Sequence, residues 1–325
     1  MTLGIGLIGV GKHGSRYAQH IVSDLSTARL VAIARRNREV ARRQAEELGC
    51  RAYGDYRELV TDPNVDAVIV VVPPTLHPEI VEAAAAARRA ILLEKPAAAH
   101  VTDGRRILVA TRRAGVPIMV AQTLRYNEVV KAICAMRDRI GAIHSLRISQ
   151  RFEPSRPAWI DDPRIAGGGI TLHTGVHSFD LVRLLSGLEA ERASCEMTSV
   201  QTSATEDNFS AVIRLANGVA LATVSGSRAT ASRSGPIELA GERGQIMGDH
   251  VFRTAQLVHG NTITPIEVAP ALPTVREVLH DFVDAVRHGR PMPIPIEEGL
   301  RAVAIAEACY RAAHSGRAET VAAID

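Results

Sequence analysis

The sequence predicts an α/β protein in two parts: a parallel sheet first, then an α+β part built on a large, mostly antiparallel open sheet. Strand and helix patterns alternate over residues 1–122, which is typical of a parallel sheet. Between residues 190 and 260, β-rich runs are separated by turn pairs such as Asn217-Gly218, which indicates hairpins. A chain of 325 residues also exceeds one ordinary core. We therefore expect domains at residues 1–122 and 123–325.

The first part is predicted from buried strands and amphipathic helices. Ala67–Val72 is wholly apolar, as expected of a strand covered on both faces, and Pro73-Pro74 ends it. The expected strands are Leu3–Ile8, Leu30–Ala34, Ala67–Val72, Ala90–Leu93 and Ile118–Ala121. The expected helices are Ser15–Leu25, Glu39–Leu48, Pro78–Arg89 and Asp103–Ala114.

The second part mixes helices with strands that alternate polar and apolar residues. Its expected strands are Ser145–Phe152, Ala211–Leu215, Val219–Ser225, Ile237–Ala240 and Gln245–Met247. Its expected helices are Asn127–Arg139, Thr171–Leu185, Val275–Arg287 and Glu297–Ala313. The sequence leaves open on which domain the last two helices pack.

The composition argues against binding to nucleic acid, against a membrane-spanning segment and against an oxidising compartment. The net charge of +3 and the lack of a basic block interleaved with aromatics argue against nucleic acid. No apolar run is long enough to cross a membrane. The four cysteines form no CxxC pair, and no secretory signal precedes Leu3, so we expect a reducing compartment, the cytoplasm.

A glycine turn, Gly9-x-Gly11-x-x-Gly14, follows the first strand and opens the first helix. In that context GxGxxG predicts a dinucleotide site of the Rossmann type, because the glycines let the backbone approach a pyrophosphate at the helix N-terminus. Lys12 and His13 lie within the turn and are candidate cofactor ligands. The alternative is a tight turn that binds nothing.

The residues after the second strand favour NADP over NAD. NAD-binding folds place an acid near this point to hold the ribose 2′-hydroxyl, but here the chain reads Arg35-Arg36. Two guanidinium groups suit a 2′-phosphate. The alternative is that both arginines point to solvent, and NAD then remains the second choice of cofactor.

Lys95 is the first candidate catalytic residue. Arginine is the default cation of this chain, and Lys12, Lys95 and Lys131 are its only lysines. Lys95 follows an apolar strand, and ligands of open parallel sheets gather beyond the carboxyl ends of the strands. An ammonium can also lose its proton when buried, which a guanidinium cannot.

Two histidines follow the glycine run Gly167–Gly169. If Thr171–Leu185 is one helix, His173 and His177 lie one turn apart on one face. Histidine suits proton transfer near neutral pH, so both are candidate catalytic residues. The alternatives are a structural role or a metal pair completed by His100, but no second metal motif is visible and we predict no metal.

In order and spacing, these motifs resemble those of the glucose–fructose oxidoreductase / inositol dehydrogenase / MocA family over nearly the whole chain. The stretches that carry the resemblance are the glycine turn, Pro73-Pro74-Thr75-Leu76-His77, Glu94-Lys95-Pro96, Arg125-Tyr126-Asn127, Gly167–Asp180, Ile296-Glu297-Glu298-Gly299 and Ala308-Cys309-Tyr310. The resemblance implies a Rossmann domain followed by an α/β domain whose open sheet forms a homodimer or homotetramer. It also implies hydride transfer between NAD or NADP and a hydroxyl or ketone of a sugar, cyclitol or related molecule.

The resemblance assigns Lys95 as the catalytic lysine and His177 as the acid/base histidine. Pro73, His77 and Glu94 are expected beside the cofactor. The family often has Asp where this chain has His173, so the partner that orients His177 is in question. A non-catalytic NADP-binding regulator of the same fold is the alternative function.

The expected mechanism has His177 take the hydroxyl proton while Lys95 stabilises the charge on the same oxygen. His173 would bind a substrate hydroxyl or relay the proton. Further candidates for contact with the small-molecule substrate are Arg125, Arg151, Arg156, Trp159 and Tyr310.

Overall fold

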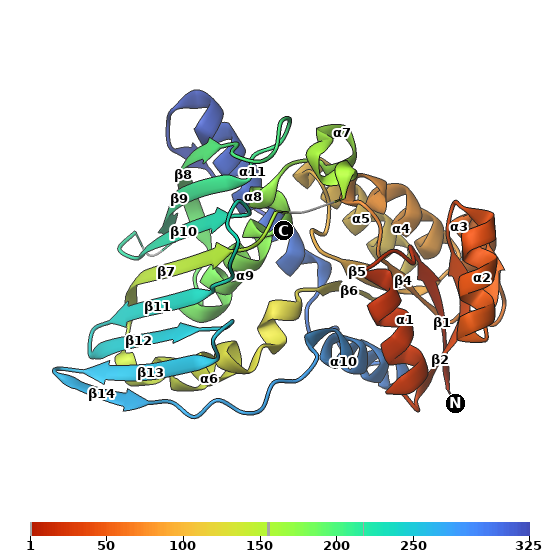
Figure 1. Ribbon diagram of the computed structural model, residues 1–325, viewed down its shortest axis with the longest axis horizontal. Coiled ribbons are helices and arrows are strands. Elements are labelled where there is room, and N and C mark those ends of the chain that lie inside the picture. Colours follow the sequence, from red (N-terminus) through yellow and green to blue (C-terminus); the bar gives the residue numbers. More distant parts are fainter. Residues whose placement is uncertain (1, 155–156, 217) are drawn as a thin grey trace. The chain divides into compact units, whose positions relative to one another are not determined.

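The computed structural model describes residues 2–154, 157–216 and 218–325. The chain folds into two compact units (Figure 1). The first comprises the chain up to Thr123 together with Pro273–Gly299, and the second comprises Leu124–Leu272 together with Leu300–Asp325. Arg156 lies outside the described residues.

The first unit is built on a six-stranded parallel sheet with the strand order β3-β2-β1-β4-β5-β6. This order is that of a Rossmann fold, with its switch point between β1 and β4. The strands are β1 Leu3–Ile8, β2 Ala28–Ala34, β3 Arg51–Tyr53, β4 Ala67–Val70, β5 Ala90–Glu94 and β6 Ile118–Ala121. The α-helices are α1 Gly14–Ser23, α2 Arg38–Leu48, α3 Tyr56–Thr61, α4 His77–Ala86, α5 Val101–Ala114 and α10 Thr274–His288, and η1 Pro74–Leu76 is a short 3-10 helix.

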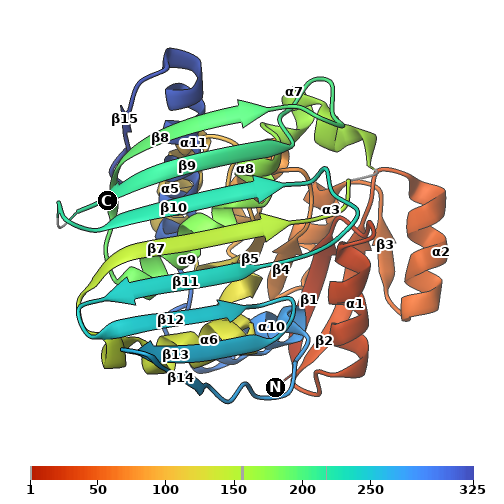
Figure 2. The ribbon, with the colours of Figure 1, turned by 60° about the vertical axis from the view of Figure 1, so that its left-hand side comes forward.

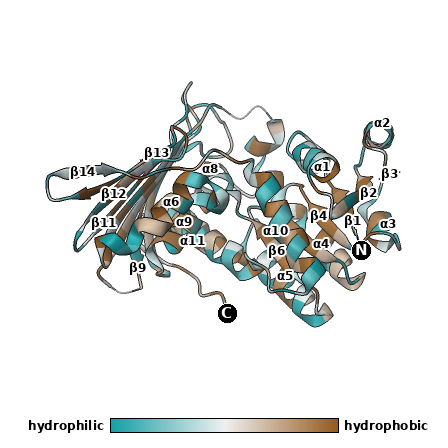
Figure 3. Cartoon of the chain, turned by 90° about the horizontal axis from the view of Figure 1, so that it is seen from below, coloured by the Kyte–Doolittle hydropathy of each residue, from teal (hydrophilic) through white to brown (hydrophobic). Residues whose placement is uncertain are grey.

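Apolar strands form the core of this unit. Every residue of β1, β4, β5 and β6 is buried, and Figure 3 shows β1, β2 and β4 in the colours of hydrophobic residues. Such strands are expected where helices cover both faces of the sheet. The sequence did not predict β3 and α3, since both are short and carry little periodicity. Helix α10, whose domain the sequence left open, contacts α1 and β6.

The second unit contains a nine-stranded sheet with the order β14-β13-β12-β11-β7-β10-β9-β8-β15. All neighbours are antiparallel except β7 and β10, which run parallel. The strands are β7 Ile143–Arg151, β8 Ala190–Thr198, β9 Asn208–Leu215, β10 Leu221–Ser227, β11 Pro236–Gly241, β12 Gly244–Asp249, β13 Thr254–His259, β14 Thr262–Pro265 and β15 Glu319–Thr320. The predicted fold, a Rossmann domain followed by a large and mostly antiparallel sheet, is confirmed.

Helices cover one face of this sheet. Helix α9 contacts β7 and β10, α8 contacts β9 and β10, and α6 contacts β12 and β13. The other face is turned toward the viewer in Figure 2, with the helices behind it. The helices are α6 Glu128–Met136, α7 Pro163–Ala166, α8 Ile170–His173, α9 Gly175–Ser186 and α11 Ile296–Ser315, with the 3-10 helices η2 Thr123–Tyr126, η3 Arg137–Ile140 and η4 Ala158–Asp161.

The predicted single helix over Thr171–Leu185 is wrong. Helix α8 ends at His173 and α9 begins at Gly175, with Thr174 between them at φ −115° and ψ −41°. His173 therefore ends one helix, and His177 lies in the first turn of the next. The two histidines therefore do not share one face of one helix.

Candidate active site

The glycine turn has the shape that a dinucleotide needs. Gly9 has a φ of +94°, and a side chain there would collide with the carbonyl of Val71. A side chain at Gly14 would collide with the carbonyl of Gly9, so the helix starts tightly against the turn. At Gly11, by contrast, no described atom lies within 4 Å of the place of a Cβ. The turn is therefore closed by Gly9 and Gly14 and open at Gly11, where a pyrophosphate could approach the backbone.

Glu94 ties the end of β5 to this turn. Its Oε1 lies 2.7 Å from Nε2 of His13 and accepts a hydrogen bond of 2.6 Å from the hydroxyl of Tyr17. Its Oε2 accepts the backbone N–H of Lys95 at 2.8 Å. The position of Lys95 along the sheet edge is thus coupled to the start of α1.

This network keeps Glu94 ionised. Burial by itself raises the pKa of the carboxyl, but the hydrogen bond and charge of His13, the charge of Lys95 and the hydrogen bond from Tyr17 lower the pKa to about 2. The Tyr17 pKa is raised by burial and by Glu94, so its hydroxyl remains a donor.

The two arginines after β2 have different environments. Arg35 turns back onto the glycine turn, where its Nη1 donates to the carbonyl of Val10 at 3.0 Å and to Oε1 of Gln44 at 2.9 Å. Arg36 is exposed. It precedes Asn37, whose side chain caps α2 by accepting from the Val40 N–H. Of the two, Arg36 is thus the one with its side chain open to a ligand.

His77 is buried and faces backbone carbonyls. Its Nδ1 lies 3.2 Å from the carbonyl of Ala97, and its Nε2 lies 3.0 Å from that of Val72. Burial lowers the pKa of His77, so the ring is neutral. The structure therefore places His77 between the ends of β4 and β5, with its ring buried. Pro73, at the start of η1, remains partly exposed.

His173 is brought together with Trp159. The two rings meet edge to face with their centroids 5.6 Å apart. Nε2 of His173 lies 3.0 Å from the carbonyl of Ala166. A carbonyl only accepts, so Nε2 carries the proton when His173 is neutral. His173 is buried, whereas Trp159 is 36% exposed and forms the outer part of this pair.

His177 lies on the helix that packs against β7 and β10. Its neighbour Ser178 accepts a hydrogen bond of 2.7 Å from Nε2 of Gln150 on β7. The N–H of His177 bonds to the carbonyl of Thr174 at 3.1 Å. The hydroxyl of Thr174 in turn accepts from Nη2 of Arg228 at 3.0 Å. The start of α9 is therefore anchored to the sheet from both sides.

Arg125 is held by a buried carboxylate. Its Nε and Nη2 donate to Oδ2 and Oδ1 of Asp180 at 2.7 and 2.5 Å. The side chains are only 14% and 2% exposed. This bidentate pair fixes α9 to the segment before α6, so Asp180 supports the helix and Arg125 is engaged in the protein interior.

Asp180→Asn should destabilise the second unit strongly, because it leaves the Arg125 guanidinium buried without its counter-charge. The expected loss is about 3–5 kcal/mol, which lowers the unfolding midpoint by roughly 6–20 °C. Thermal unfolding followed by circular dichroism measures this. Glu238→Gln is the matched control, since its ion pair with Arg147 is exposed and worth less than ~1 kcal/mol. Equal midpoints for the two variants would contradict the role of the buried pair.

Two other residues predicted to contact the substrate, Arg151 and Tyr310, bind other side chains of the protein. Nη2 of Arg151 donates to Oγ of Ser225 at 3.1 Å, on the face of the sheet opposite to α9, whereas the adjacent Gln150 faces that helix. Arg151 is therefore not brought together with His177. The hydroxyl of Tyr310 is engaged with Glu206 at 2.7 Å.

Models of one protein family match both parts of the chain. A model described as an oxidoreductase family with an NAD-binding Rossmann fold matches residues 3–122. A second, described as the C-terminal alpha/beta domain of the same oxidoreductase family, matches residues 136–322. The chain belongs to this oxidoreductase family. It is the glucose–fructose oxidoreductase / inositol dehydrogenase / MocA family that the motifs resemble, and its members are NAD(P)-dependent dehydrogenases and reductases.

Three relatives of this oxidoreductase illustrate the similarity. A myo-inositol 2-dehydrogenase of Thermotoga maritima is 29% identical over 96% of this chain and 97% of that protein. A 1,5-anhydro-D-fructose reductase of Ensifer adhaerens is 30% identical over 81% of this chain and 82% of that protein. The crystal structure of a probable dehydrogenase from Thermotoga maritima superposes with a TM-score of 0.84 and 27% identity, over 98% of this chain and 99% of that one. The comparisons give no support to the regulatory alternative.

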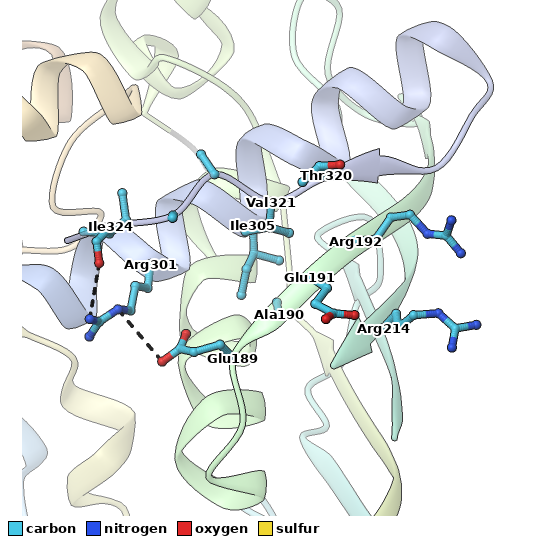
Figure 4. A pocket seen from close by; sticks show the side chains of 12 residues that line it. Glu189, Ala190, Glu191, Arg192, Arg214, Arg301, Ile305, Thr320, Val321 and Ile324 are labelled. Carbon is cyan, nitrogen blue, oxygen red and sulfur yellow. Dashed lines mark hydrogen bonds and ion pairs between the residues drawn. The ribbon is translucent and has the colours of Figure 1, made fainter. Parts of the chain in front are cut away.

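The second unit of the oxidoreductase contains a large hollow. A cavity of about 760 Å³ is lined by β8, α11 and residues 320–324 (Figure 4). Arg301 closes one side of it, with Nη2 donating to the carbonyl of Ile324 at 3.3 Å and Nε lying 3.9 Å from Oε1 of Glu189. It contains none of the predicted catalytic residues.

Metal and membrane features are absent from the described part of the oxidoreductase. No group of three His, Cys, Asp or Glu is placed there to hold a metal ion, so the His173–His177 pair finds no third ligand. No described helix is long and apolar enough to cross a membrane.

Three polar residues of this oxidoreductase were not predicted from the sequence: Gln122 and Arg228, which are buried, and Glu206, which is partly buried. Gln122 follows β6 and is 1% exposed, and both atoms of its side-chain amide lack a hydrogen-bond partner among the described residues. Arg228 and Glu206 bind the segment around α8. Gln122 could have been found as a polar residue directly after an apolar strand. Glu206 and Arg228 stand in polar stretches that carry no such signal.

Proposed function

We propose that the chain is an NADP-dependent enzyme that interconverts a hydroxyl and a ketone on a sugar or cyclitol. The first unit, which comprises the chain up to Thr123 together with Pro273–Gly299, binds the nucleotide, and the second unit binds the substrate. The observation that carries this proposal is the bond network of Glu94. Glu94 binds His13 in the glycine turn, Tyr17 in α1 and the backbone N–H of Lys95. Lys95 is the lysine to which the family resemblance assigns a catalytic role.

The reaction needs a proton acceptor and a group that stabilises the charged oxygen. The nicotinamide, when bound, supplies the hydride acceptor or donor. In the oxidation direction His177 takes the hydroxyl proton, and Lys95 donates a hydrogen bond to the same oxygen. In reduction, His177 returns the proton to that oxygen.

The substrate class is inferred from the relatives and from one aromatic pair. The relatives are named for a cyclitol and an anhydro-sugar. Trp159 and His173 offer a partly exposed apolar ring beside a polar one, which suits a molecule with CH faces and hydroxyl edges. We assign substrate contacts to these two residues, and supporting roles to Arg125, Tyr310 and Arg151.

A substrate screen tests this function. The purified enzyme is incubated with NADPH and a panel of sugar and cyclitol ketones, and with NADP and the matching alcohols, while absorbance of the reduced nicotinamide is followed. Turnover of at least one member supports the proposal. Tight cofactor binding without turnover of any sugar or cyclitol would contradict the substrate class.

NADP is the proposed cofactor because of Arg36. It is exposed beside the capped N-terminus of α2, and no acid stands after β2 to receive a ribose 2′-hydroxyl. Gly9, Gly11 and Gly14 supply the pyrophosphate site. Lys12 is exposed within this turn, and His13 is half-exposed and paired with Glu94. Arg35 shapes the turn by holding the carbonyl of Val10.

Arg36→Ala should weaken NADPH binding about 10-fold or more and leave NADH binding nearly unchanged, since only NADPH carries the 2′-phosphate. Fluorescence titration with both nucleotides measures the two dissociation constants. Arg43→Ala, an exposed arginine farther along α2, is the control. An equal loss of NADPH and NADH affinity in Arg36→Ala would contradict this assignment.

The open face of the nine-stranded sheet is the proposed oligomer interface. It carries exposed apolar side chains, among them Val212 and Leu221, at 47% and 40% exposure. A homodimer or homotetramer would cover them, since large exposed apolar patches mark interaction sites. Light scattering coupled to gel filtration measures the assembly, and a monomer at micromolar concentration would contradict it.

The proposed location is a reducing compartment, the cytoplasm. All four cysteines are free thiols. Burial raises the pKa of the Cys50 thiol to about 11, which makes it a poor nucleophile at neutral pH.

A further inference from the structure

The start of α8 is bound by one carboxylate. Oε2 of Glu206 accepts the N–H of Gly169 at 3.1 Å, and its Oε1 accepts the N–H of Thr171 at 2.9 Å. The backbone carbonyl of Glu206 accepts the N–H of Ile170, which lies between them, at 2.9 Å. Three successive backbone donors thus end on Glu206, and the opening of α8 is fixed in position and direction.

Tyr310 completes the arrangement from α11. Its hydroxyl donates to Oε1 of Glu206 at 2.7 Å and accepts the N–H of Gly169 at 3.0 Å. Burial, then the charge and hydrogen bond of Glu206, raise the pKa of Tyr310 well above its ordinary value, so the hydroxyl keeps its proton. A side chain at Gly168 would collide with this hydroxyl, and one at Gly169 with the carbonyl of Glu206. Glycine is therefore required at positions 168 and 169, because Tyr310 and Glu206 lie too close to the backbone there for a side chain.

The loop that carries Glu206 is itself held by two carboxylates. Asp161, in the same short helix as Trp159, accepts the N–H groups of three loop residues at 2.9 Å: Ser203, Ala204 and Thr205. Asp207 accepts three more, from Val200 at 2.8 Å, Gln201 at 2.6 Å and Thr202 at 3.1 Å. The backbone N–H groups of residues 200–205, which directly precede Glu206, are therefore all bound by these two carboxylates.

Hydrogen bonds continue from this anchor to the two histidines. The N–H of His173 bonds to the carbonyl of Gly169 at 3.0 Å, and the N–H of Thr174 to that of Ile170 at 2.8 Å. From Thr174 the chain passes into α9, where the N–H of His177 bonds to the Thr174 carbonyl. A shift at Gly169 and Ile170 would move both imidazoles.

We propose that Glu206 and Tyr310 are positioning residues for the reaction: together they set the start of α8 and so place His173 and His177. The inference rests on the proposed acid/base role of His177. Misplacing a catalytic group by about 1 Å can cost on the order of 10²-fold in rate. The predicted substrate role of Tyr310 is replaced by this one.

Tyr310→Phe in the full-length enzyme tests the proposal, with Tyr53→Phe as matched control. Tyr53 also donates its hydroxyl to a carboxylate, that of Asp62 at 2.9 Å, in the other unit. We expect kcat to fall at least ~10-fold in Tyr310→Phe and in Glu206→Gln, with the NADPH dissociation constant within about two-fold of wild type. Thermal midpoints of the two tyrosine variants should be similar. Unchanged kcat in Tyr310→Phe, or an equal loss in Tyr53→Phe, would overturn the proposal.

Hydrogen exchange separates this inference from the proposed function. With NADPH present, the peptide covering residues 169–177 should exchange at least ~10-fold faster in Tyr310→Phe than in wild type, and at an unchanged rate in Tyr53→Phe. If the wild type turns over no sugar or cyclitol, the proposed function fails while this measurement still decides the placement of α8. Unaltered exchange over residues 169–177 would overturn the positioning role.

Discussion

Lys95→Met lowers kcat by about 10²–10³-fold while NADPH binding stays within about two-fold of wild type. Methionine keeps much of the length of lysine but removes the ammonium that we propose stabilises the charged substrate oxygen. Cofactor binding survives because Glu94 holds the backbone N–H of Lys95, which the substitution leaves in place, together with His13 and Tyr17. Steady-state kinetics and fluorescence titration measure the two effects.

Lys131→Met is the control for this experiment. Lys131 is exposed on α6 and pairs with Glu128 at 2.9 Å, so its loss should leave kcat unchanged. Lys95→Met with normal turnover, or with NADPH affinity lost along with turnover, would contradict the assigned role.

His177→Asn removes the proposed acid/base group and lowers kcat by about 10²–10⁴-fold. The amide of asparagine occupies similar space but does not exchange a proton with the substrate. In the oxidation direction the wild-type rate should fall at low pH, because a general base accepts a proton only in its unprotonated form. That acidic limb should vanish in the variant. Rates at pH values from 5 to 9 measure it.

His314→Asn, at an exposed position of α11, is the control and should keep both rate and profile. An acidic limb that persists in His177→Asn would assign the proton transfer to another group, and His173 would then be the next variant to make.

The first unit was largely predictable because its signals are local. Strands such as Ala67–Val70 are continuous apolar runs, and proline or glycine marks their ends. The missed strands are different: β8 reads AERASCEMT, with four polar or charged side chains exposed on one face, and β14 has only four residues, all of them exposed. Their strand conformation comes from pairing with distant neighbours, which a local pattern does not encode.

The sequence motifs of the candidate site could be predicted, but the long-range hydrogen bonds that hold these motifs in place could not. Lys95 can be recognised because lysine is rare in this chain and this one follows an apolar strand. The glycine turn can be recognised because it lies between a strand and a helix. The break at Thr174 cannot be recognised in this way, and the hydroxyl of Thr174 is bound by Arg228, 54 residues away. Tyr310 reaches Gly169 across 141 residues, and Arg35 turns back to a carbonyl of the glycine turn. Such contacts are properties of the folded chain.

Titration of the purified protein with NADPH and with NADH, followed by nicotinamide fluorescence, tests the central claim most directly. The account predicts that both bind and that NADPH binds at least ~10-fold more tightly, because Arg36 meets the 2′-phosphate and no acid receives the ribose hydroxyl. Tighter binding of NADH would contradict the NADP assignment while leaving the oxidoreductase intact. Binding of neither nucleotide would contradict the proposed roles of both Lys95 and His177, since each of these roles requires a bound nicotinamide.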